Sequence, residues 1–264
     1  MIPTSRLSAD ERARIGALLA DEPWFDFYWQ CSLDDLASGL DNRSYRLGRR
    51  GLGLILAVHF EGVSIYSTVG DLDRDDTRCI AEGRARAEVH ALDAHAPWIR
   101  AQTQARMERE DRILYCRLDV RARAPRAAVP ADVEVRRITG QDHAEVLAFY
   151  SRHYRETVLS AWMLELPFAA VWASGELAAA AGTIAMSRRL GSCHVGHFLT
   201  DPAHRGRGLA GAAAAVLFDQ LRAEGMATLS LGVSEDNVAA WRAYERLGFE
   251  RVGARPVLYL AGRE

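Results

Sequence analysis

Lysine is missing from this sequence, and asparagine occurs only at Asn42 and Asn237. All 33 basic residues are therefore arginine. A GC-rich genome favours arginine and alanine over lysine and asparagine, which accounts for the bias; selection against lysine is the alternative. The 35 acidic residues bring the net charge to −2. This balance argues against a nucleic-acid partner, which requires a basic face.

Long apolar runs are also absent. No stretch of 18 apolar residues occurs, so we expect no membrane-spanning helix and no membrane partner. The first six residues lead into polar, helix-like sequence rather than into an apolar segment, which argues against a signal peptide. We therefore expect a cytoplasmic protein.

Cysteine is scarce, and no two cysteines have the C-x-x-C spacing of a zinc site or a redox dithiol. The four cysteines are Cys31, Cys79, Cys116 and Cys193. Their scattered, apolar surroundings predict free, mostly buried thiols in a reducing compartment. We expect no metal cofactor.

The length of 264 residues, 49% of them apolar, fits two globular domains of about 130 residues. Residues 121–132 contain two prolines and alternating arginines, a composition typical of a stiff, solvated linker. We predict an N-terminal α+β domain over residues 1–120, the linker over 121–132, and a second domain over 133–264.

The N-terminal half begins with a helix that Ser8 caps, with Glu11 as its capping-box partner. An irregular aromatic stretch follows, and then an antiparallel three-strand meander. After a polar segment, 71–84, we expect a strand, a helix and a strand. The expected ranges are 8–20, 44–48, 52–60, 63–68, 88–92, 96–108 and 113–120. The aromatic residues are Trp24, Phe25, Phe27, Tyr28 and Trp29. They raise the alternative of a separate ligand site, although such clusters more often pack.

The C-terminal half has a similar order: a strand, a helix and a second helical turn, a three-strand meander, and then strand, helix, strand, helix and two last strands about Pro256. The expected ranges are 133–138, 141–154, 158–165, 168–173, 177–187, 193–200, 208–223, 228–233, 237–247, 249–254 and 257–261. The shared order makes an internal duplication a hypothesis. Both halves predict a mixed α/β (α+β) fold.

The strand 193–200 runs into a glycine loop that opens an alanine-rich helix. Gly206 and Gly208 lie at the start of this helix, six residues or more beyond Thr200. Unpaired N–H groups and the positive end of the helix dipole make such a start a site for phosphate or pyrophosphate. The G-x-G-x-x-G spacing also raises a dinucleotide site. The preceding antiparallel strands argue against it, because that site needs a doubly wound parallel sheet.

These residues resemble the acyl-CoA-binding motif R/Q-x-x-G-x-G/A of the GNAT superfamily of N-acyltransferases. The motif stands here as Arg205-Gly-Arg-Gly208-Leu-Ala210. The second signature of the family is similar to the stretch that runs from Asn237 through Ala240 and Tyr244 to Gly248-Phe249. The resemblance covers about residues 133–260, whereas the N-terminal half looks at most like a degenerate GNAT copy without a CoA loop.

The resemblance implies a site for acetyl-CoA. The N–H groups of the loop would hold the pyrophosphate, and the pantetheine would pair with the end of strand 193–200 as an added strand. Arg205 and Arg207 would add charge-assisted bonds, with plain surface charge as the alternative. The implied binding residues are Phe198, Leu199, Thr200, Arg205, Gly206, Arg207, Gly208, Leu209, Ala210, Gly211 and Asn237.

The resemblance makes Tyr244 the acid that protonates the departing thiolate; a core tyrosine is the alternative. Relatives that carry a glutamate as base have it at the position of Gly232, so that assignment fails. His194 is the candidate base, because some relatives carry a histidine there. His197 points to the opposite face unless a bulge intervenes. A water relay is a further alternative.

We therefore expect an N-acetyltransferase that moves an acetyl group from acetyl-CoA to a primary amine, of a small molecule or a peptide, by direct attack. The alternative is a non-catalytic acyl-CoA-binding or regulatory module. The resemblance assigns acceptor choice to residues 155–166, with Glu156 and Glu165, and to the terminal hairpin near Arg255. A monomer and a homodimer are both open.

Overall fold

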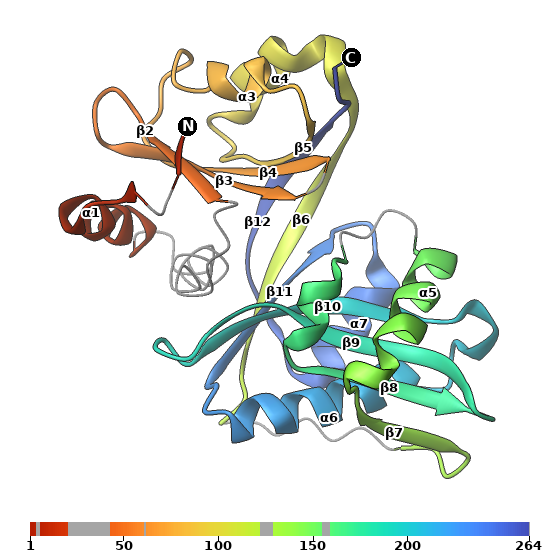
Figure 1. The fold of residues 1–264 in the computed structure, drawn as a ribbon. Helices are drawn as coiled ribbons and strands as arrows, with labels where there is room; N and C mark the ends of the chain where they lie inside the picture. Colours follow the sequence, from red (N-terminus) through yellow and green to blue (C-terminus); the bar gives the residue numbers. More distant parts are fainter. Residues whose placement is uncertain (4–5, 21–42, 61, 122–128, 155–158, 264) are drawn as a thin grey trace. The chain divides into compact units, whose positions relative to one another are not determined.

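The computed structural model describes residues 1–264 except 4–5, 21–42, 61, 122–128, 155–158 and 264 (Figure 1). The chain forms two compact units. Unit 1 comprises Met1–Tyr115, Val233–Asn237 and Val252–Glu264, and unit 2 comprises Cys116–Gly232 and Val238–Arg251. The aromatic stretch 24–29 and most of the expected linker lie outside the described residues.

Unit 1 is built on a sheet in which β1 to β5 follow one another in chain order and β12 pairs with β5. All of these pairs are antiparallel except β4 with β5. The elements are β1 Ile2–Pro3, α1 Ala9–Ala20, β2 Arg43–Leu47, β3 Gly53–Phe60, β4 Val63–Gly70, α3 Arg78–Glu82, β5 Arg86–His90, α4 Ala96–Thr103, a 3₁₀ turn Gln104–Arg106 (η3), β6 Met107–Asp119 and β12 Glu250–Leu260. The strands β6 and β12 have residues in both units. The expected meander is therefore confirmed.

Helix α1 begins where the capping box predicts. The Ser8 hydroxyl accepts from the Glu11 amide at 3.2 Å, and the Glu11 carboxylate accepts from the Ser8 amide at 2.9 Å. Ile15 and Leu19 of α1 are fully buried against Leu54 of β3. Alternation along the strands therefore places one apolar face of this sheet under α1.

Two expectations for unit 1 need correction. The polar segment 71–84 contains the short helix α3, whose Ile80 is fully buried in the second core of the unit. The helix buries only this one side chain, so the sequence of the segment shows no helical periodicity of apolar residues. Helix α4 ends at Thr103 rather than near residue 108, because the chain enters β6 at Met107 and strand pairing replaces helical bonds.

Unit 2 is also organised around one sheet, in which β11, β10, β9, β8 and β7 are successive neighbours. The pairs are antiparallel except β10 with β11. The elements are β7 Val133–Arg137, a 3₁₀ turn Gly140–Asp142 (η4), α5 His143–His153, a 3₁₀ turn Ala161–Glu165 (η5), β8 Phe168–Ala173, β9 Glu176–Ser187, β10 Ser192–Thr200, a 3₁₀ turn Pro202–His204 (η6), α6 Leu209–Ala223, β11 Thr228–Ser234 and α7 Val238–Leu247.

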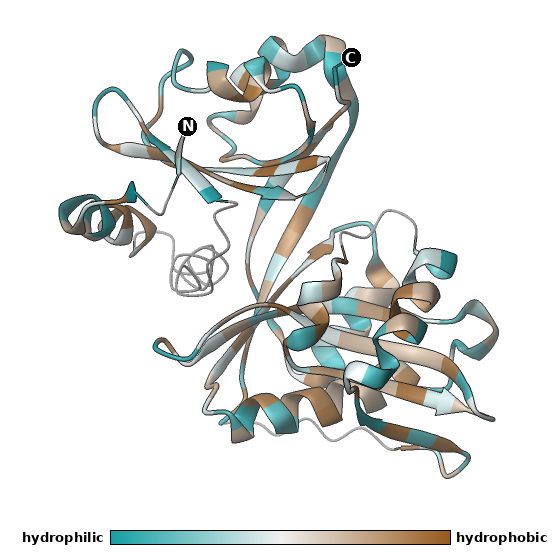
Figure 2. Cartoon of the chain, in the orientation of Figure 1, coloured by the Kyte–Doolittle hydropathy of each residue, from teal (hydrophilic) through white to brown (hydrophobic). Residues whose placement is uncertain are grey.

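The middle of this sheet is apolar on both faces. Every residue of β8 is buried, and Figure 2 shows β8 and β9 as mostly hydrophobic. Val146, Phe149 and Tyr150 of α5 pack with Phe168 of β8 in one core cluster. Helix α6 contributes a run of fully buried alanines at residues 212–214. The small alanine side chains let a helix backbone approach the strands closely.

The start of α5 is held by charged groups. Asp142 accepts from the amide of Thr139 at 2.7 Å and pairs with the guanidinium of Arg136 through two contacts of 2.8 Å. The hydrogen bonds from Arg136 hold the pKa of Asp142 well below its usual range. This pair fixes the end of β7 to the first turn before α5.

The last part of the chain differs from the expected pair of strands. β12 is one continuous strand through Pro256, which lies just before the first residue paired with β5. The Pro256 carbonyl still accepts from the amide of Ala91 at 3.1 Å, so the proline is tolerated at the end of the ladder. Arg255 is 1% exposed and donates to the carbonyl of Thr68 at 2.7 Å. The expected terminal hairpin with its loop near Arg255 is therefore wrong.

The two units repeat one order of elements. In each, a helix precedes a three-strand antiparallel meander, which is followed by a helix, a strand parallel to the last meander strand, and a second helix. In unit 1 these are α1, β2–β4, α3, β5 and α4; in unit 2 they are α5, β8–β10, α6, β11 and α7. The hypothesis of a repeated architecture is thus supported at the level of the fold.

Candidate functional site

The glycine loop of unit 2 has the geometry of an anion cradle. Gly206 and Gly208 have φ values of +79° and +76°, which glycine adopts without strain. A Cβ at either position would meet no atom within 4 Å, so the backbone is open on this side. The amide of Ala212 is bonded to the carbonyl of Gly208, so the N–H groups of residues 209–211 precede the first helical bond. Left-handed glycines before a helix start make a concavity lined by N–H groups.

The two loop arginines differ in their partners. Arg207 pairs with Asp132 at 2.5 Å and lies 3.1 Å from Nδ1 of His204. Arg205 is exposed and makes no salt bridge with a described residue. Of the two expected phosphate contacts, Arg205 is therefore the one whose charge is available.

The strand before the loop separates from its parallel neighbour. β10 pairs with β11 only over three residues, the last pair being His194 with Ser230. Beyond His194, β10 continues to Thr200 paired with β9 alone. The edge of β10 that carries Phe198 and Thr200 is thus left without β11 as a partner, as an added extended ligand would require.

A bulge interrupts this part of β10. Gly196 pairs with Gly182 and Leu199 with Ala180, so His197 and Phe198 together oppose one residue of β9. His197 has a φ of +56°, a left-handed conformation that costs a non-glycine residue about 1 kcal/mol. The bulge directs neighbouring side chains differently: Leu199 joins the core under α5, whereas Phe198 contacts Tyr244 of α7.

The ring of His197 lies among aromatic side chains. It stacks on Phe168 with centroids 5.8 Å apart and meets the Tyr150 ring edge-on at 5.9 Å. Burial lowers the pKa of His197 to about 4. At neutral pH this histidine is uncharged, and its side chain belongs to the core beneath the bulge.

Folding stability should report this burial. An unfolded histidine titrates near 6.5, so between pH 6.5 and 4 the unfolded chain takes up a proton that folded His197 refuses. The free energy of unfolding should therefore fall as the pH drops through this window, with up to about 3 kcal/mol from this group. His197→Asn should show a smaller fall in denaturant titrations at pH 7, 5 and 4. Equal pH dependence of the free energy of unfolding in both proteins would refute the lowered pKa of His197.

Tyr244 lies directly beside the bulge. Its ring meets that of Phe198 at 5.0 Å and 67°, and that of Phe249 at 6.1 Å. Burial raises the pKa of Tyr244 well above 10, and the neighbouring Tyr154 and Cys116 raise it further. The phenol therefore stays protonated and is placed against the edge of β10 where the strands diverge.

Three groups around Tyr244 were missed in the sequence. Tyr150 and Tyr154 are aromatic residues at the end of α5, and such residues are usually read as core. Cys116 is buried on β6, and burial raises the pKa of its thiol to about 12, so it is not a thiolate nucleophile. No local sequence signal distinguishes these three from packing residues.

The histidine candidate for the base lies next to β11. Nδ1 of His194 is 2.9 Å from the hydroxyl of Ser230, and its side chain is partly exposed. Gly232, which stands where relatives carry glutamate, is exposed on β11. Asn237 directly precedes α7. Among the described residues, no group of three or more histidines, cysteines or carboxylates is arranged to hold a metal ion.

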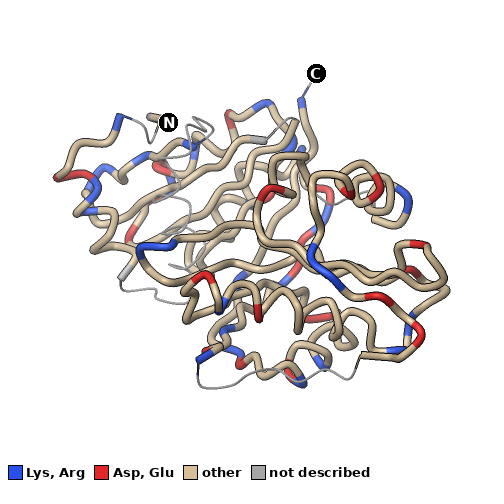
Figure 3. Tube along the Cα trace, turned by 60° about the horizontal axis from the view of Figure 1, so that its bottom comes forward, with Lys and Arg blue, Asp and Glu red and all other residues tan. Residues whose placement is uncertain are grey.

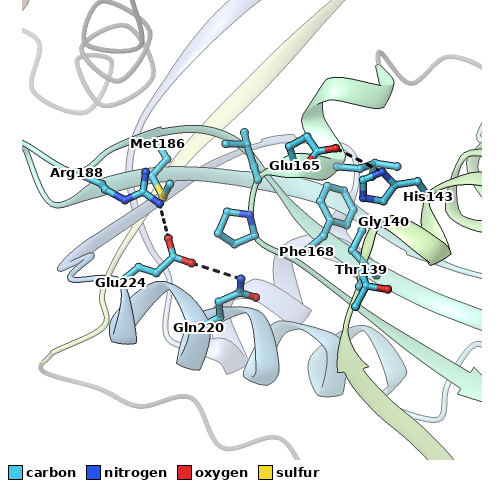
Figure 4. Close-up of a pocket in the computed structure, with 13 residues that line it drawn as sticks. Thr139, Gly140, His143, Glu165, Phe168, Met186, Arg188, Gln220 and Glu224 are labelled. Atoms are coloured by element: carbon cyan, nitrogen blue, oxygen red, sulfur yellow. Dashed lines mark hydrogen bonds and ion pairs between the residues drawn. The ribbon is translucent and has the colours of Figure 1, made fainter. Parts of the chain in front are cut away.

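A separate cavity of about 280 Å³ lies in unit 2 at the other end of α6 (Figure 4). It is lined by Gln220 and Glu224 from the last turns of α6, whereas the glycine loop precedes its first turn. Its charged groups are paired: Glu224 with Arg188 at 2.9 Å, and Glu165 with His143 at 3.7 Å. None of the implied acetyl-CoA residues lines this cavity, but Glu165, from the segment expected to choose the acceptor, does.

The corresponding loop of unit 1 is acidic. Between β4 and α3 it carries four aspartates, at positions 71, 73, 75 and 76. Asp76 is 2% exposed, and its carboxylate accepts from the amides of Arg49 and Asp73 at 3.0 and 3.1 Å. β4 and β5 stay paired over five residues. Unlike unit 2, this unit shows neither an open glycine cradle nor diverging strands in its described residues.

Charges of both signs are interspersed along the described chain (Figure 3). None of the helices in the described ranges is both long and apolar enough to cross a membrane.

Comparison with known proteins identifies the domain. Residues 136–249 match the Acetyltransferase (GNAT) family. Residues 136–249 are therefore a GNAT-family domain, and both motifs fall within this range. No match was found among the curated proteins.

Several solved structures share the fold over nearly the whole chain. A Drosophila protein has a TM-score of 0.75 at 15% identity, covering 98% of each chain. A GCN5-related N-acetyltransferase-like protein from Streptococcus suis has a TM-score of 0.68 at 17% identity, covering 96% of this chain and 99% of its own. A tandem GNAT protein from the clavulanic acid biosynthesis pathway has a TM-score of 0.60 at 15% identity, covering 100% and 98%. At this identity the likeness shows the fold, and the N-terminal half is similar in structure alone.

Proposed function

We propose that the protein is an N-acetyltransferase that moves an acetyl group from acetyl-CoA to a primary amine of a small molecule or peptide. The observation that carries the proposal is the contact between Phe198 and Tyr244. It joins the strand that ends in the glycine loop to the helix of the second signature. This contact supports a donor site and an acid that lie together in unit 2.

The residues present fit acetyl-CoA. The open cradle at Gly206 and Gly208 suits a pyrophosphate, because N–H groups approach it without a Cβ in the way. Arg205 adds a positive charge, and Phe198, Leu199 and Thr200 offer an unpaired strand edge. Leu209, Ala210 and Gly211 would supply the amides of the first helical turn, and Arg207 and Asn237 are the remaining implied contacts. When bound, this co-substrate supplies an activated acetyl thioester.

Direct transfer is favoured over an acyl-enzyme. Buried Cys116 is held as a thiol by its raised pKa, so the nearest cysteine lacks the reactive form. The protonated phenol of Tyr244 is placed to donate to a leaving thiolate. An amide of β10 near Thr200 would stabilise charge on the carbonyl oxygen of the thioester.

His194 is the proposed general base, and its removal should be visible in the pH profile. His194→Ala should lower kcat/KM at pH 7 about tenfold or more, with recovery as the pH rises and the amine loses its proton unaided. His143→Ala, a histidine beside the distant cavity, is the matched control. A kcat/KM profile identical to wild type would assign the proton to water or to another group.

The activity itself is tested by following release of the CoA thiol with a panel of amines, peptides and aminoglycosides. Tight acetyl-CoA binding by calorimetry without turnover on any acceptor would support the alternative, a non-catalytic acyl-CoA-binding module. We further propose that the domains over residues 1–120 and 133–264 share the fold but not the ligand. The acidic loop around Asp76 and the unbroken β4–β5 pairing support a single donor site in each chain.

A further inference from the structure

Tyr150 of α5 connects to the bulge of β10 through its hydroxyl group. The side chain is 1% exposed, and its hydroxyl donates a hydrogen bond to the carbonyl oxygen of His197. Burial raises the pKa of Tyr150 well above 10, so the group is a permanent donor. Neither signature of the family contains this residue, and the mechanism above assigns it no role.

The bulge needs such support. His197 holds a left-handed conformation that few residues other than glycine adopt, and residues 197 and 198 together oppose one residue of β9. The Tyr150 hydroxyl gives the displaced carbonyl a partner. The Tyr150 and Phe168 rings also enclose the His197 ring, which limits how the residue can relax.

The bulge in turn contacts the proposed acid. Phe198 follows His197 directly and makes the edge-to-face contact with Tyr244. One turn further along α5, Nε2 of His153 lies 3.5 Å from a carboxylate oxygen of Asp201, and Asp201 accepts from the amide of Ala203 at the start of the loop. Helix α5 therefore contacts β10 at the bulge and again where the loop begins.

We propose that Tyr150 is a positioning residue for acyl transfer, whose hydroxyl holds the His197 bulge so that Phe198 orients Tyr244. The proposal rests on the proposed acetyltransferase function. Tyr150 touches neither substrate in this account. It acts through the backbone of β10, so its loss should affect the chemical step more than donor binding.

The test is Tyr150→Phe, which removes the hydroxyl and keeps the ring. We expect kcat to fall at least tenfold, with the Kd for acetyl-CoA from calorimetry within threefold of wild type. Adding His197→Asn should restore kcat at least threefold over the single variant, because asparagine enters the left-handed region more readily and needs less support. A structural role alone would not produce this recovery.

Tyr45→Phe is the matched control, because it removes another buried hydroxyl, one that donates to Glu11 at 2.6 Å in unit 1. It should leave kcat within twofold of wild type. The proposal is overturned if Tyr150→Phe keeps wild-type kcat, if its Kd weakens in parallel with kcat, or if His197→Asn gives no recovery. Wild-type protein that binds acetyl-CoA but turns over no amine would refute the proposed function itself, and this proposal with it.

Discussion

Replacement of Tyr244 by phenylalanine should lower kcat about 100-fold while the Kd for acetyl-CoA changes less than about threefold. Phenylalanine keeps the ring contacts with Phe198 and Phe249, so the packing beside β10 is preserved. The variant lacks the hydroxyl proton that Tyr244 would donate to the leaving thiolate. The burial that keeps this phenol protonated also disfavours a charged CoA thiolate formed beside it. Without a proton donor, the barrier to release of that thiolate therefore rises.

Steady-state release of the CoA thiol measures the effect. Tyr66→Phe is the control, because Tyr66 is another buried tyrosine whose pKa burial raises, and it lies on β4 of unit 1. Its kcat should stay within twofold of wild type. A Tyr244→Phe variant with unchanged kcat would make Tyr244 a packing residue and would leave the acid unassigned.

Gly208→Ala should weaken acetyl-CoA binding about 30- to 100-fold. Alanine at a φ of +76° costs about 1 to 2 kcal/mol, and the distorted amides of the first turn would no longer converge on the pyrophosphate. The Cβ would also project into the open side of the cradle. Calorimetry with CoA reads the loss without any acceptor amine.

Gly175→Ala separates strain from ligand contact. Gly175 has a φ of +83° and open space around it, but it lies in the turn between β8 and β9. Gly175→Ala should lower the free energy of unfolding by as much as Gly208→Ala does, and it should leave the Kd for CoA within twofold of wild type. Equal weakening in both variants would mean that general destabilisation, rather than the cradle, limits binding.

The sequence predicted those parts of the site that depend on local spacing. The glycines before α6, the helix of Tyr244 and the capping box of α1 follow from residue types at fixed distances, and the structure confirms their elements. Local rules such as these depend on backbone conformation and on neighbours within one turn.

Other parts depend on contacts between distant residues. The bulge at His197 depends on pairing with β9 and on the ring of Phe168. The adjacent Gly196 permits a bulge but does not specify one. Tyr150 has the spacing of a core residue, and only the folded structure shows that its hydroxyl donates to the carbonyl of His197. Pro256 resembled a break, yet it lies where the ladder with β5 begins and one missing donor is tolerated.

The acidic loop of unit 1 has a consequence for how such a repeated fold is divided between two tasks. Asp76 supplies a carboxylate to two backbone amides, so this copy carries its anion as part of its own polypeptide. An anion that cannot dissociate cannot be exchanged, whatever the concentration of an outside competitor. Under the proposed function, unit 2 alone would respond to the supply of a diffusible donor, whereas the carboxylate of Asp76 in unit 1 is held by its own chain at any donor concentration.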